Sequence, residues 1–355
     1  MRTLNVAIIG YGRSGRDIHT HLLNMLPDRY RIVAYAEIDE QRRDMIWAER
    51  RLDASVDYTG LFGRTDLDLV VNASFSRQHA EISRALMQNG FDVLSEKPAA
   101  RNEAEFDDIL ETARSTGRRY FVFQQYRFSP AFLKIRDIIA SGQLGRIVQI
   151  SLYYDGFARR WDWQTIHAWG GGSLLNTGPH PVDHALALLD FPKDVQVCAA
   201  MDCAQTSGDG EDYVKLILKA QDRPVVDIEI SSCHAYAPKT FLVQGTRGTL
   251  YGGTEHLDWT YYRDDENPPQ PLQTRPLRNE KGEPLYCREK LVRHTDSWDA
   301  AGPDFDEKGK GFYIALYETL VNGAPFAVTS EQVKQQLQVI DQAHAQNKAL
   351  FDQAF

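Results

Sequence analysis

The stretch LNVAIIGYGRSG, residues 4–15, joins an apolar run of strand length to three glycines. A run that is apolar at almost every position is typical of a strand buried on both faces of a parallel sheet. The segment after the glycines repeats its apolar residues at helical spacing. A strand, a glycine-rich turn and a helix make up the phosphate-binding turn of dinucleotide-binding domains. The stretch therefore predicts a Rossmann domain at the start of the chain.

The three glycines have different tasks in such a turn. Gly10 permits the tight turn, Gly12 lets a pyrophosphate approach the backbone, and Gly15 lets the helix pack on the strand. The unpaired N–H groups of the helix start then face the phosphates. The predicted cofactor contacts of this turn are Gly10, Tyr11, Gly12, Arg13, Ser14 and Gly15.

The next expected strand, residues 31–36, ends at Glu37, which stands 22 residues after Gly15. A carboxylate at this place accepts hydrogen bonds from both ribose hydroxyls and repels a 2′-phosphate. We therefore predict NAD rather than NADP as the cofactor. Arg42 and Arg43 keep the alternative open, because a guanidinium there could pair with a 2′-phosphate.

Strands and helices continue to alternate, which predicts a doubly wound parallel sheet. The expected elements are residues 67–74, 77–89, 91–98, 103–115 and 119–125. Ligands of such sheets bind beyond the carboxyl ends of the strands. Ser74 and Glu96 fall at such ends, and we predict that they contact the cofactor together with His79.

Lys97 stands in the tripeptide Glu96-Lys97-Pro98 at the end of an expected buried strand. A lysine beside a nicotinamide can bind a substrate hydroxyl and help to take its proton. Its own pKa falls when the site is partly desolvated and cationic. The alternative is a surface lysine that pairs with Glu96.

With this tripeptide in register with the glycine turn, the chain resembles the Gfo/Idh/MocA family, the group of glucose-fructose oxidoreductase and inositol dehydrogenase. The resemblance covers essentially the whole chain and rests on residues 10–15, 70–100, 141–150 and 170–191. It implies a Rossmann domain followed by a domain with an open, mostly antiparallel sheet, whose outer face commonly forms the oligomer interface.

The expected fold class is therefore α/β, with a doubly wound parallel sheet followed by an α+β domain. We place the NAD(P)-binding domain at residues 1–125 and the substrate-binding and oligomerisation domain at 126–355. The second half independently offers alternating runs of strand length between 147 and 253, separated by turn residues. Residues 262–306 are expected to form a long surface excursion. A closing helix is expected from Ser330 to about Phe351, with Thr329 or Ser330 as its cap.

The stretch GGGSLLNTGPHPVDH, residues 170–184, predicts a loop that enters a helix, because proline is tolerated in a first helical turn. His180 lies in that turn, and Asp183 is expected on the same side, where it could orient the imidazole. In relatives that the chain resembles, the equivalent histidine lies beside the catalytic lysine as a proton acceptor. We therefore predict Lys97 and His180 as the catalytic pair. The alternative is a histidine that only satisfies backbone groups at a helix start.

Many relatives have an aspartate where this chain has Asn176. Without that carboxylate, the protonated forms of Lys97 and His180 are less stabilised, so both should titrate at lower pH. The amide can still bind a substrate oxygen, and we predict that Asn176 positions the substrate.

The segment DGFARRWDWQTIHAW, residues 155–169, interleaves tryptophans with charged and amide groups, which suits stacking and lateral hydrogen bonding of a polyhydroxylated ring. The same composition suits a dimer interface. From it we select Trp163 as a substrate contact. Tyr126 and Arg127 are also predicted contacts, because they follow the last Rossmann strand where the two domains should meet; for Arg127 a hinge salt bridge is the alternative.

His180 and His184 have the i, i+4 spacing of zinc ligands, but no third ligand is evident nearby and the chemistry needs none, so no metal is predicted. The alternative for His184 is a solvated or capped side chain.

The 355 residues carry a formal net charge of −9, which works against binding to nucleic acid. Four cysteines without a CxxC pair fit a reducing cytoplasm, and no apolar run is long enough to cross a membrane. The expected partners are a carbohydrate-like small molecule and further copies of the chain, as a dimer or tetramer.

Together these features predict an NAD-dependent oxidoreductase that acts on a secondary alcohol or ketone of a sugar, cyclitol or glycoside. One alternative uses a tightly bound NAD for transient oxidation followed by elimination or cleavage of a glycosidic bond. Another alternative is a non-catalytic dinucleotide-binding regulator.

Overall fold

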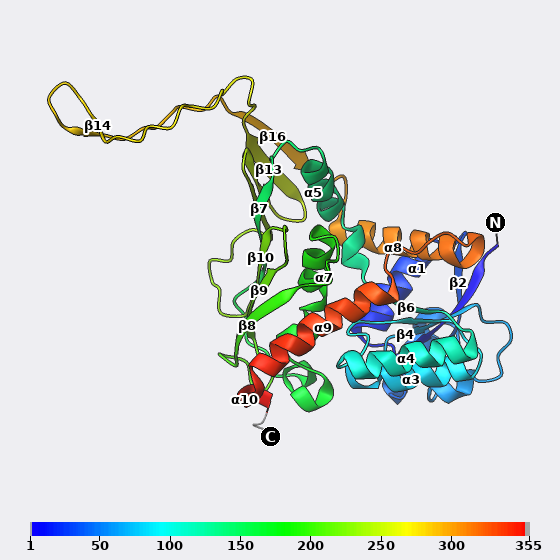
Figure 1. The fold of residues 1–355 in the computed structure, drawn as a ribbon. Helices are drawn as coiled ribbons and strands as arrows, with labels where there is room; N and C mark the ends of the chain where they lie inside the picture. The colour runs from blue at the N-terminus through cyan, green and yellow to red at the C-terminus, as the bar shows by residue number, and fades with distance from the viewer. Residues whose placement is uncertain (1, 352–355) are drawn as a thin grey trace.

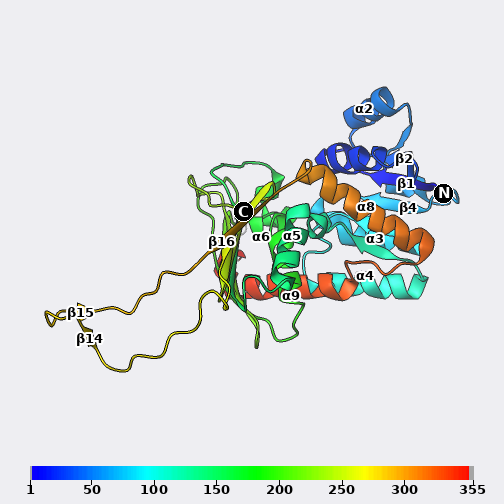
Figure 2. The same ribbon diagram turned by 90° about the horizontal axis from the view of Figure 1, so that it is seen from above.

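A computed structural model describes residues 2–351 of the chain. Two sheets lie side by side, with helices α5, α7 and α9 between them and a long arm projecting from the second sheet (Figures 1 and 2). The α/β fold predicted from the sequence is confirmed.

The first sheet is parallel and has the strand order β3-β2-β1-β4-β5-β6 of a doubly wound fold. Its strands are β1 (Leu4–Ile9), β2 (Tyr30–Ala36), β3 (Ala54–Ser55), β4 (Leu69–Asn72), β5 (Val93–Ser95) and β6 (Tyr120–Val122). The central strands β1 and β4 are buried almost throughout, and for β1 its apolar run predicted this.

Helices cover both faces of this sheet. They are η1 (Arg13–Thr20), which is wound as a π-helix, α1 (His21–Asn24), α2 (Glu40–Arg50), α3 (His79–Gln88), α4 (Glu103–Thr116) and α8 (Asp304–Asn322). Alternate residues of β1 point to opposite faces: Val6 and Ile8 join the cluster that contains Phe312 of α8, whereas Ala7 joins the cluster on the side of α3 and α4. Helix α8 therefore completes the core of the Rossmann sheet from the far end of the chain.

The second sheet has the order β16-β13-β12-β11-β7-β10-β9-β8 and is antiparallel except for the pair β7 and β10. Its strands are β7 (Ile147–Asp155), β8 (Gln196–Asp202), β9 (Tyr213–Lys219), β10 (Val225–Ser231), β11 (Phe241–Gly245), β12 (Gly248–Gly252), β13 (His256–Tyr261) and β16 (His294–Asp299). One face is apolar and packs on helices; the other face is not covered by any helix of residues 2–351 (Figure 2).

The helices between the sheets are α5 (Pro130–Ala140), α6 (Ser173–Asn176), α7 (Pro179–Leu188), α9 (Ser330–Gln346) and α10 (Lys348–Phe351). Thr329 begins α9 with a capping box, as expected for that position, because its side chain and that of Gln332 each accept the other's backbone N–H. The predicted closing helix is interrupted at Asn347, so its last turn is the separate α10.

The predicted excursion at residues 262–306 is only partly correct. Residues 263–293 do leave the body of the molecule as an arm, with strands β14 (Leu277–Arg278) and β15 (Pro284–Leu285) at its tip. Strand β16 then returns to pair with β13, and α8 begins at Asp304. Antiparallel pairing with a strand already in place, rather than any strong local pattern, holds β16 in the sheet.

Candidate active site

A cavity of about 690 Å³ opens at the carboxyl ends of the Rossmann strands. The glycine turn after β1 lines it, and so do Lys97 and Asn176. The cavity therefore joins the predicted cofactor turn to the predicted catalytic lysine.

The surroundings of the three glycines differ, and two of the three positions exclude a side chain. Gly10 has a φ of +88°, and a Cβ on it would lie 2.5 Å from the carbonyl oxygen of Ala73. A Cβ on Gly15 would lie 1.9 Å from the carbonyl oxygen of Gly10, which fixes the close packing of helix on turn. At Gly12 the nearest atom is 3.5 Å away, on the flexible Arg42 side chain, so this backbone faces the open cavity. This cradle fits a pyrophosphate.

The other predicted residues of the turn divide between the cavity and the core. Arg13 and Ser14 line the cavity. Tyr11 does not: its ring is buried and its hydroxyl donates to Glu49 Oε2 at 2.8 Å. Its contribution is its backbone N–H, which holds the side chain of Glu37.

Glu37 lines the cavity directly after β2, and its carboxylate is fixed from both sides. Oε2 accepts the N–H of Tyr11 at 2.6 Å, and Oε1 accepts the N–H of Asp39 at 2.9 Å. Arg42 Nη1 lies 3.9 Å from Oε2 and also lines the cavity. Arg43 is directed to the carbonyl oxygens of Glu37 and Ile38 instead. Glu37 and Arg42 therefore lie next to each other in the cavity lining, whereas Arg43 is held by backbone carbonyls.

Ser74 and His79 both line the middle of the cavity, and the imidazole joins two of its loops. His79 Nδ1 lies 2.8 Å from the carbonyl oxygen of Pro98, and Nε2 lies 3.1 Å from that of Ser74. Burial lowers the pKa of His79, so the neutral ring donates to one carbonyl at a time. His79 thus holds the loop that carries Lys97.

Glu96 also lines the cavity, but its carboxylate is almost fully buried. It accepts the N–H of Lys97 at 3.0 Å and lies 3.1 Å from His19 Nε2, while His19 Nδ1 lies 2.7 Å from the hydroxyl of Tyr313 on α8. Burial raises the pKa of Glu96, but the hydrogen bond and charge of His19 and the charge of Lys97 outweigh it and hold the pKa at about 2. The carboxylate is therefore ionised and fixes the backbone of the lysine.

Lys97 donates from Nζ to the carbonyl oxygen of Asn176 at 2.7 Å. Burial lowers the pKa of the ammonium group; Glu96 opposes this, while Arg13 and Arg160 add to it. The amide oxygen of Asn176 accepts a hydrogen bond from Gln164 Nε2 at 3.0 Å. Lys97, Asn176 and Gln164 all line the cavity, so one polar group from the first domain faces two from the second.

His180 is the second residue of α7 and does not line this cavity. Its ring stacks on Tyr126, with centroids 3.9 Å apart, and Lys308 Nζ lies 3.7 Å from the centroid of the Tyr126 ring. His180 Nδ1 is buried without a hydrogen-bond partner among residues 2–351. Burial, followed by the charges of Lys97, His184 and Lys308, places the pKa of His180 well below its usual range. Lys97 is thus an electrostatic neighbour of His180.

The expectation that Asp183 orients His180 is wrong. Asp183 instead forms a buried two-point ion pair with Arg127: Nε donates to Oδ2 at 2.8 Å, and Nη2 contacts Oδ1. Arg127 Nη1 also donates to the carbonyl of Ala327 at 2.9 Å and to Gln332 Oε1 at 2.7 Å. Neither Arg127 nor Tyr126 lines the cavity. The guanidinium thus joins three segments of the fold, which favours the hinge alternative, while the substrate contacts of Arg127 and Tyr126 stay predictions.

His184 is fully buried, so of the two expectations for it, a solvated or a capped side chain, the solvated one is wrong. Its Nε2 lies 2.9 Å from the carbonyl of Tyr126, its Nδ1 lies 3.2 Å from the hydroxyl of Tyr154, and its ring stacks on Phe132. Both nitrogens are thus engaged within the core.

The three tryptophans of residues 155–169 lie in different surroundings. Trp163 lines the cavity and packs edge-on against Phe75, with ring centroids 5.2 Å apart. Trp169 lies under the guanidinium of Arg77, and Trp161 is 81% exposed. Further cavity residues that we did not predict as contacts are Phe75, Tyr58, Thr59, Arg160, Asp162 and Gln164. Arg160, Asp162 and Gln164 stand in the quoted segment, so its composition could have indicated them; Phe75, Tyr58 and Thr59 are visible only in the fold.

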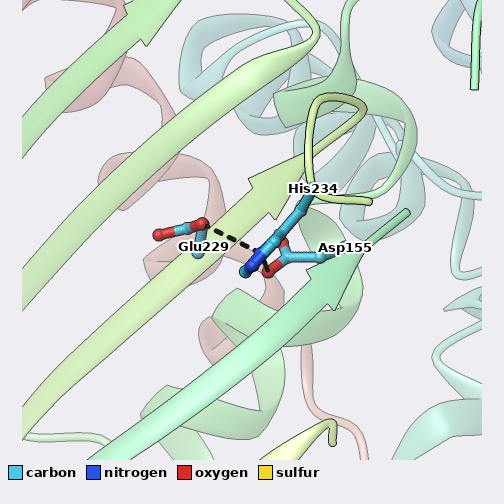
Figure 3. A group of neighbouring side chains, drawn as sticks. All are labelled: Asp155, Glu229 and His234. Atoms are coloured by element: carbon cyan, nitrogen blue, oxygen red, sulfur yellow. Dashed lines mark hydrogen bonds and ion pairs between the residues drawn. The ribbon is translucent and has the colours of Figure 1, made fainter. Parts of the chain in front are cut away.

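Within residues 2–351, one group of side chains has the spacing of metal ligands: Asp155, Glu229 and His234, whose ligand atoms lie within 4.8 Å of one another. Figure 3 shows His234 Nδ1 between the two carboxylates, 3.0 Å from Asp155 Oδ2 and 3.7 Å from Glu229 Oε1. Lys215 Nζ lies 2.9 Å from Glu229 Oε2 and already brings a cation to the group. The group lies apart from the cavity lining, and we assign no metal to it.

Among the helices of residues 2–351, none combines the length and the apolar composition that crossing a bilayer requires.

Comparison with known proteins identifies the family. A profile described as "Oxidoreductase family, NAD-binding Rossmann fold" matches residues 4–124, and one described as "GFO/IDH/MocA C-terminal domain" matches residues 132–251. The chain belongs to the Gfo/Idh/MocA family, as its resemblance predicted, and is an oxidoreductase with an NAD-binding Rossmann domain.

Individual relatives are distant. The chain is 24% identical to scyllo-inositol 2-dehydrogenase (NADP(+)) IolW of Bacillus subtilis, over 98% of this chain and 94% of that protein. It is 23% identical to 2,7-anhydro-N-acetylneuraminate hydratase of Mediterraneibacter gnavus, over 73% of this chain and 71% of that protein. The solved structure of GenD2 from gentamicin A biosynthesis in complex with NAD superposes with a TM-score of 0.74 at 17% identity, covering 98% of this chain and 95% of that chain.

Proposed function

We propose that the chain is an NAD-dependent dehydrogenase or reductase that acts on a CH–OH group of a sugar, cyclitol or glycoside. The observation that carries the proposal is the single cavity that extends from the Gly12 backbone and Glu37 to Lys97 and Asn176. A cofactor seated on the glycine turn would extend toward the lysine, which is the geometry that hydride transfer needs.

NAD, when bound, supplies the hydride acceptor. The task of this chain is to hold the alcohol and take its proton, and Lys97 is the group within the cavity that suits the task. Its lowered pKa makes the neutral amine accessible, and its contact with the Asn176 carbonyl fixes the position of Nζ. His180 remains a predicted second proton acceptor, on the weaker ground of electrostatic proximity to Lys97.

The polyhydroxylated substrate is supported by the walls of the cavity near Lys97. Trp163 offers an aromatic face, and Gln164, Asn176 and Arg160 offer amide and guanidinium groups beside it. The relative from Bacillus subtilis, whose name is that of an inositol dehydrogenase, acts on a compound of this chemical class.

The proposal is tested by NAD reduction against a panel of sugars, inositols and glycosides. We expect at least one of them to give NADH in a one-to-one ratio with the oxidised product. A panel that gives neither NADH nor product would contradict the proposed substrate class.

A second candidate is transient oxidation followed by elimination with a retained NAD. The similarity to a hydratase of an anhydro-sugar favours it. The same panel separates the two functions, because this candidate requires product to form while the nicotinamide absorbance returns to its starting value.

We propose NAD rather than NADP because Glu37 is fixed in the cavity by two backbone N–H groups. In Glu37→Gln the carboxylate charge is lost while the size is kept, and Arg42 remains nearby. We expect the ratio of kcat/KM for NAD over NADP to fall by about tenfold, the equivalent of about 1.4 kcal/mol. Glu40→Gln, an exposed acid at the start of α2, is the matched control and should leave the ratio unchanged. An unaltered ratio in Glu37→Gln would contradict the assigned role.

The division at residues 125 and 126 remains a proposal for where the two domains meet, with the qualification that α8 packs on the first sheet. Assembly into a homo-oligomer is likewise a proposal. The uncovered face of the second sheet supports it, because Tyr251 on that face is 43% exposed.

A further inference from the structure

The second domain contributes one wall of the cavity. The cavity-lining residues that follow position 125 are Arg160, Asp162, Trp163, Gln164 and Asn176, and we call them the second-domain wall. Lys97, from the first domain, contacts this wall through the carbonyl oxygen of Asn176. A substrate held beside Lys97 therefore meets those hydrogen-bonding groups of the wall that the protein itself leaves unoccupied.

Arg160 determines how two amide groups of the wall are oriented. A guanidinium can only donate hydrogen bonds. Arg160 Nη2 contacts Gln164 Oε1, so the opposite end of the Gln164 amide is its NH₂ group. This group, Nε2, donates to Asn176 Oδ1 at 3.0 Å. The oxygen of the Asn176 amide is thereby engaged, and its donor, Nδ2, is left for a ligand.

The other unoccupied polar groups of the wall are donors as well. Among residues 2–351, neither Arg160 Nη1 nor Trp163 Nε1 forms a hydrogen bond, and the same is true of Asn176 Nδ2. An indole nitrogen and a guanidinium nitrogen both lack the ability to accept. Three side chains of the wall therefore present donors to a ligand.

The acceptors of the wall are already engaged. The carboxylate of Asp162 accepts hydrogen bonds from Nε and Nη2 of Arg160 and from the backbone N–H of Gln164. The backbone carbonyl oxygens of residues 160 and 162–164 each accept a backbone N–H group, and that of Asn176 accepts Lys97 Nζ. The wall thus offers hydrogen-bond donors in excess of acceptors.

This excess of donors distinguishes between classes of carbohydrate. A hydroxyl group must donate as well as accept, and a buried donor without an acceptor costs free energy. A carboxylate or a phosphate only accepts, and its charge strengthens the hydrogen bonds that it receives from a guanidinium. The wall therefore suits an anionic oxygen group better than a neutral polyol.

We propose that the second-domain wall binds an anionic oxygen group of the substrate, a carboxylate or a phosphate, and that Gln164 is the positioning residue that directs the donor of Asn176 toward it. The substrate is then an acidic or phosphorylated carbohydrate. This inference rests on the proposed function, because it names the class of that function's substrate. Its principal readout is ligand binding, which requires no turnover.

The first experiment measures dissociation constants by isothermal titration calorimetry on the chain saturated with NADH. The probes are two matched sets, glucose with glucuronate and glucose 6-phosphate, and galactose with galacturonate and galactose 6-phosphate. We expect an anionic member to bind at least about tenfold more tightly than the neutral member of its set. The tighter of the two anions identifies the group as carboxylate or phosphate. Anionic members that bind no better than the neutral sugars, or do not bind, overturn the proposal.

The second experiment reverses the polarity of the wall. Gln164→Glu keeps the size of the side chain and its contact with Arg160, but a carboxylate cannot donate to Asn176 Oδ1. The Asn176 amide must then turn, so that its oxygen is presented to the ligand. We expect the affinity for the anionic probe to fall at least about tenfold and that for the neutral sugar to change by less than about threefold. Asn176→Asp should act in the same direction.

The matched control is Gln221→Glu, which adds the same charge at an exposed position between β9 and β10 and should leave both affinities unchanged. Retained NADH binding shows that each variant is folded. A purely structural role of Gln164 would weaken the anionic and the neutral probe alike. That result, or an anionic preference that survives in both Gln164→Glu and Asn176→Asp, overturns the proposal.

NADH formation separates this inference from the proposed function. If the anionic probes bind preferentially and no member of either set is oxidised, the proposed reaction fails while the assigned recognition stands. If NADH forms from the neutral members alone, the reaction stands and the anionic substrate class is wrong.

Discussion

Lys97→Ala is expected to lower kcat by about 10²-fold or more, with little change in the dissociation constant of NAD. The loss follows from position: Lys97 lines the cavity, and its Nζ is held 2.7 Å from the Asn176 carbonyl oxygen. Without it, the substrate hydroxyl has no fixed group to receive its proton. The measurement is steady-state turnover on the substrate found in the panel, together with NAD binding by fluorescence.

The pH profile gives this prediction a sharper form. Oxidation requires the neutral amine, so kcat/KM should fall as the pH falls through the pKa of Lys97. Because burial lowers that pKa, the midpoint should lie below the usual value for lysine of about 10.4. This fall of kcat/KM at low pH should disappear in Lys97→Ala. It should persist in Lys193→Ala, which removes an exposed lysine before β8. Near-normal turnover in Lys97→Ala would rule out the mechanism.

His180→Ala provides the corresponding test for the second predicted acceptor. If His180 shares the proton transfer, its loss should also reduce kcat by about 10²-fold while NAD binding is retained. Since the ring is stacked on Tyr126 and Nδ1 has no partner within the described residues, His180→Phe is the informative companion. The phenyl ring keeps an aromatic surface on Tyr126, so restored turnover in His180→Phe would assign the histidine a packing role.

The Rossmann half could be predicted from sequence because its signals are local. A buried parallel strand is apolar along its whole length, and the glycine turn is dictated by contacts such as the 1.9 Å approach at Gly15. Lys97 and Asn176 could also be singled out, since each lies in a short motif. The direct contact between Lys97 and Asn176 could not be predicted from the sequence, because it depends on how the two domains pack against each other.

The parts that could not be predicted depend on distant segments. Helix α8 covers the first sheet although it begins 298 residues after Val6, and its Tyr313 reaches Glu96 through His19. Asp183 was expected to orient the imidazole of His180 because the two residues lie three positions apart on one helix. Helical spacing places two side chains on one side but does not show what approaches from outside, and here the approaching group is Arg127.

That ion pair leads to the second large effect: Arg127→Met is expected to lower the free energy of unfolding by about 3–5 kcal/mol. The Arg127 side chain is 6% exposed and that of Asp183 is 1% exposed, so the substitution leaves a carboxylate charge buried without its cation. It also removes the hydrogen bonds to Ala327 and Gln332 that join the start of α9 to the domain junction. Urea denaturation followed by circular dichroism measures the change.

The control and the kinetics separate this structural role from the substrate contact predicted for Arg127. Arg64→Met breaks a pair whose side chains are 35% and 51% exposed, and it should cost no more than about 1 kcal/mol. If Arg127 instead bound substrate, Arg127→Met would raise KM and leave stability near that of the Arg64→Met control. If Arg127 has a structural role, the reverse is expected, because each nitrogen of the guanidinium already makes at least one hydrogen bond within the protein and Arg127 does not line the cavity.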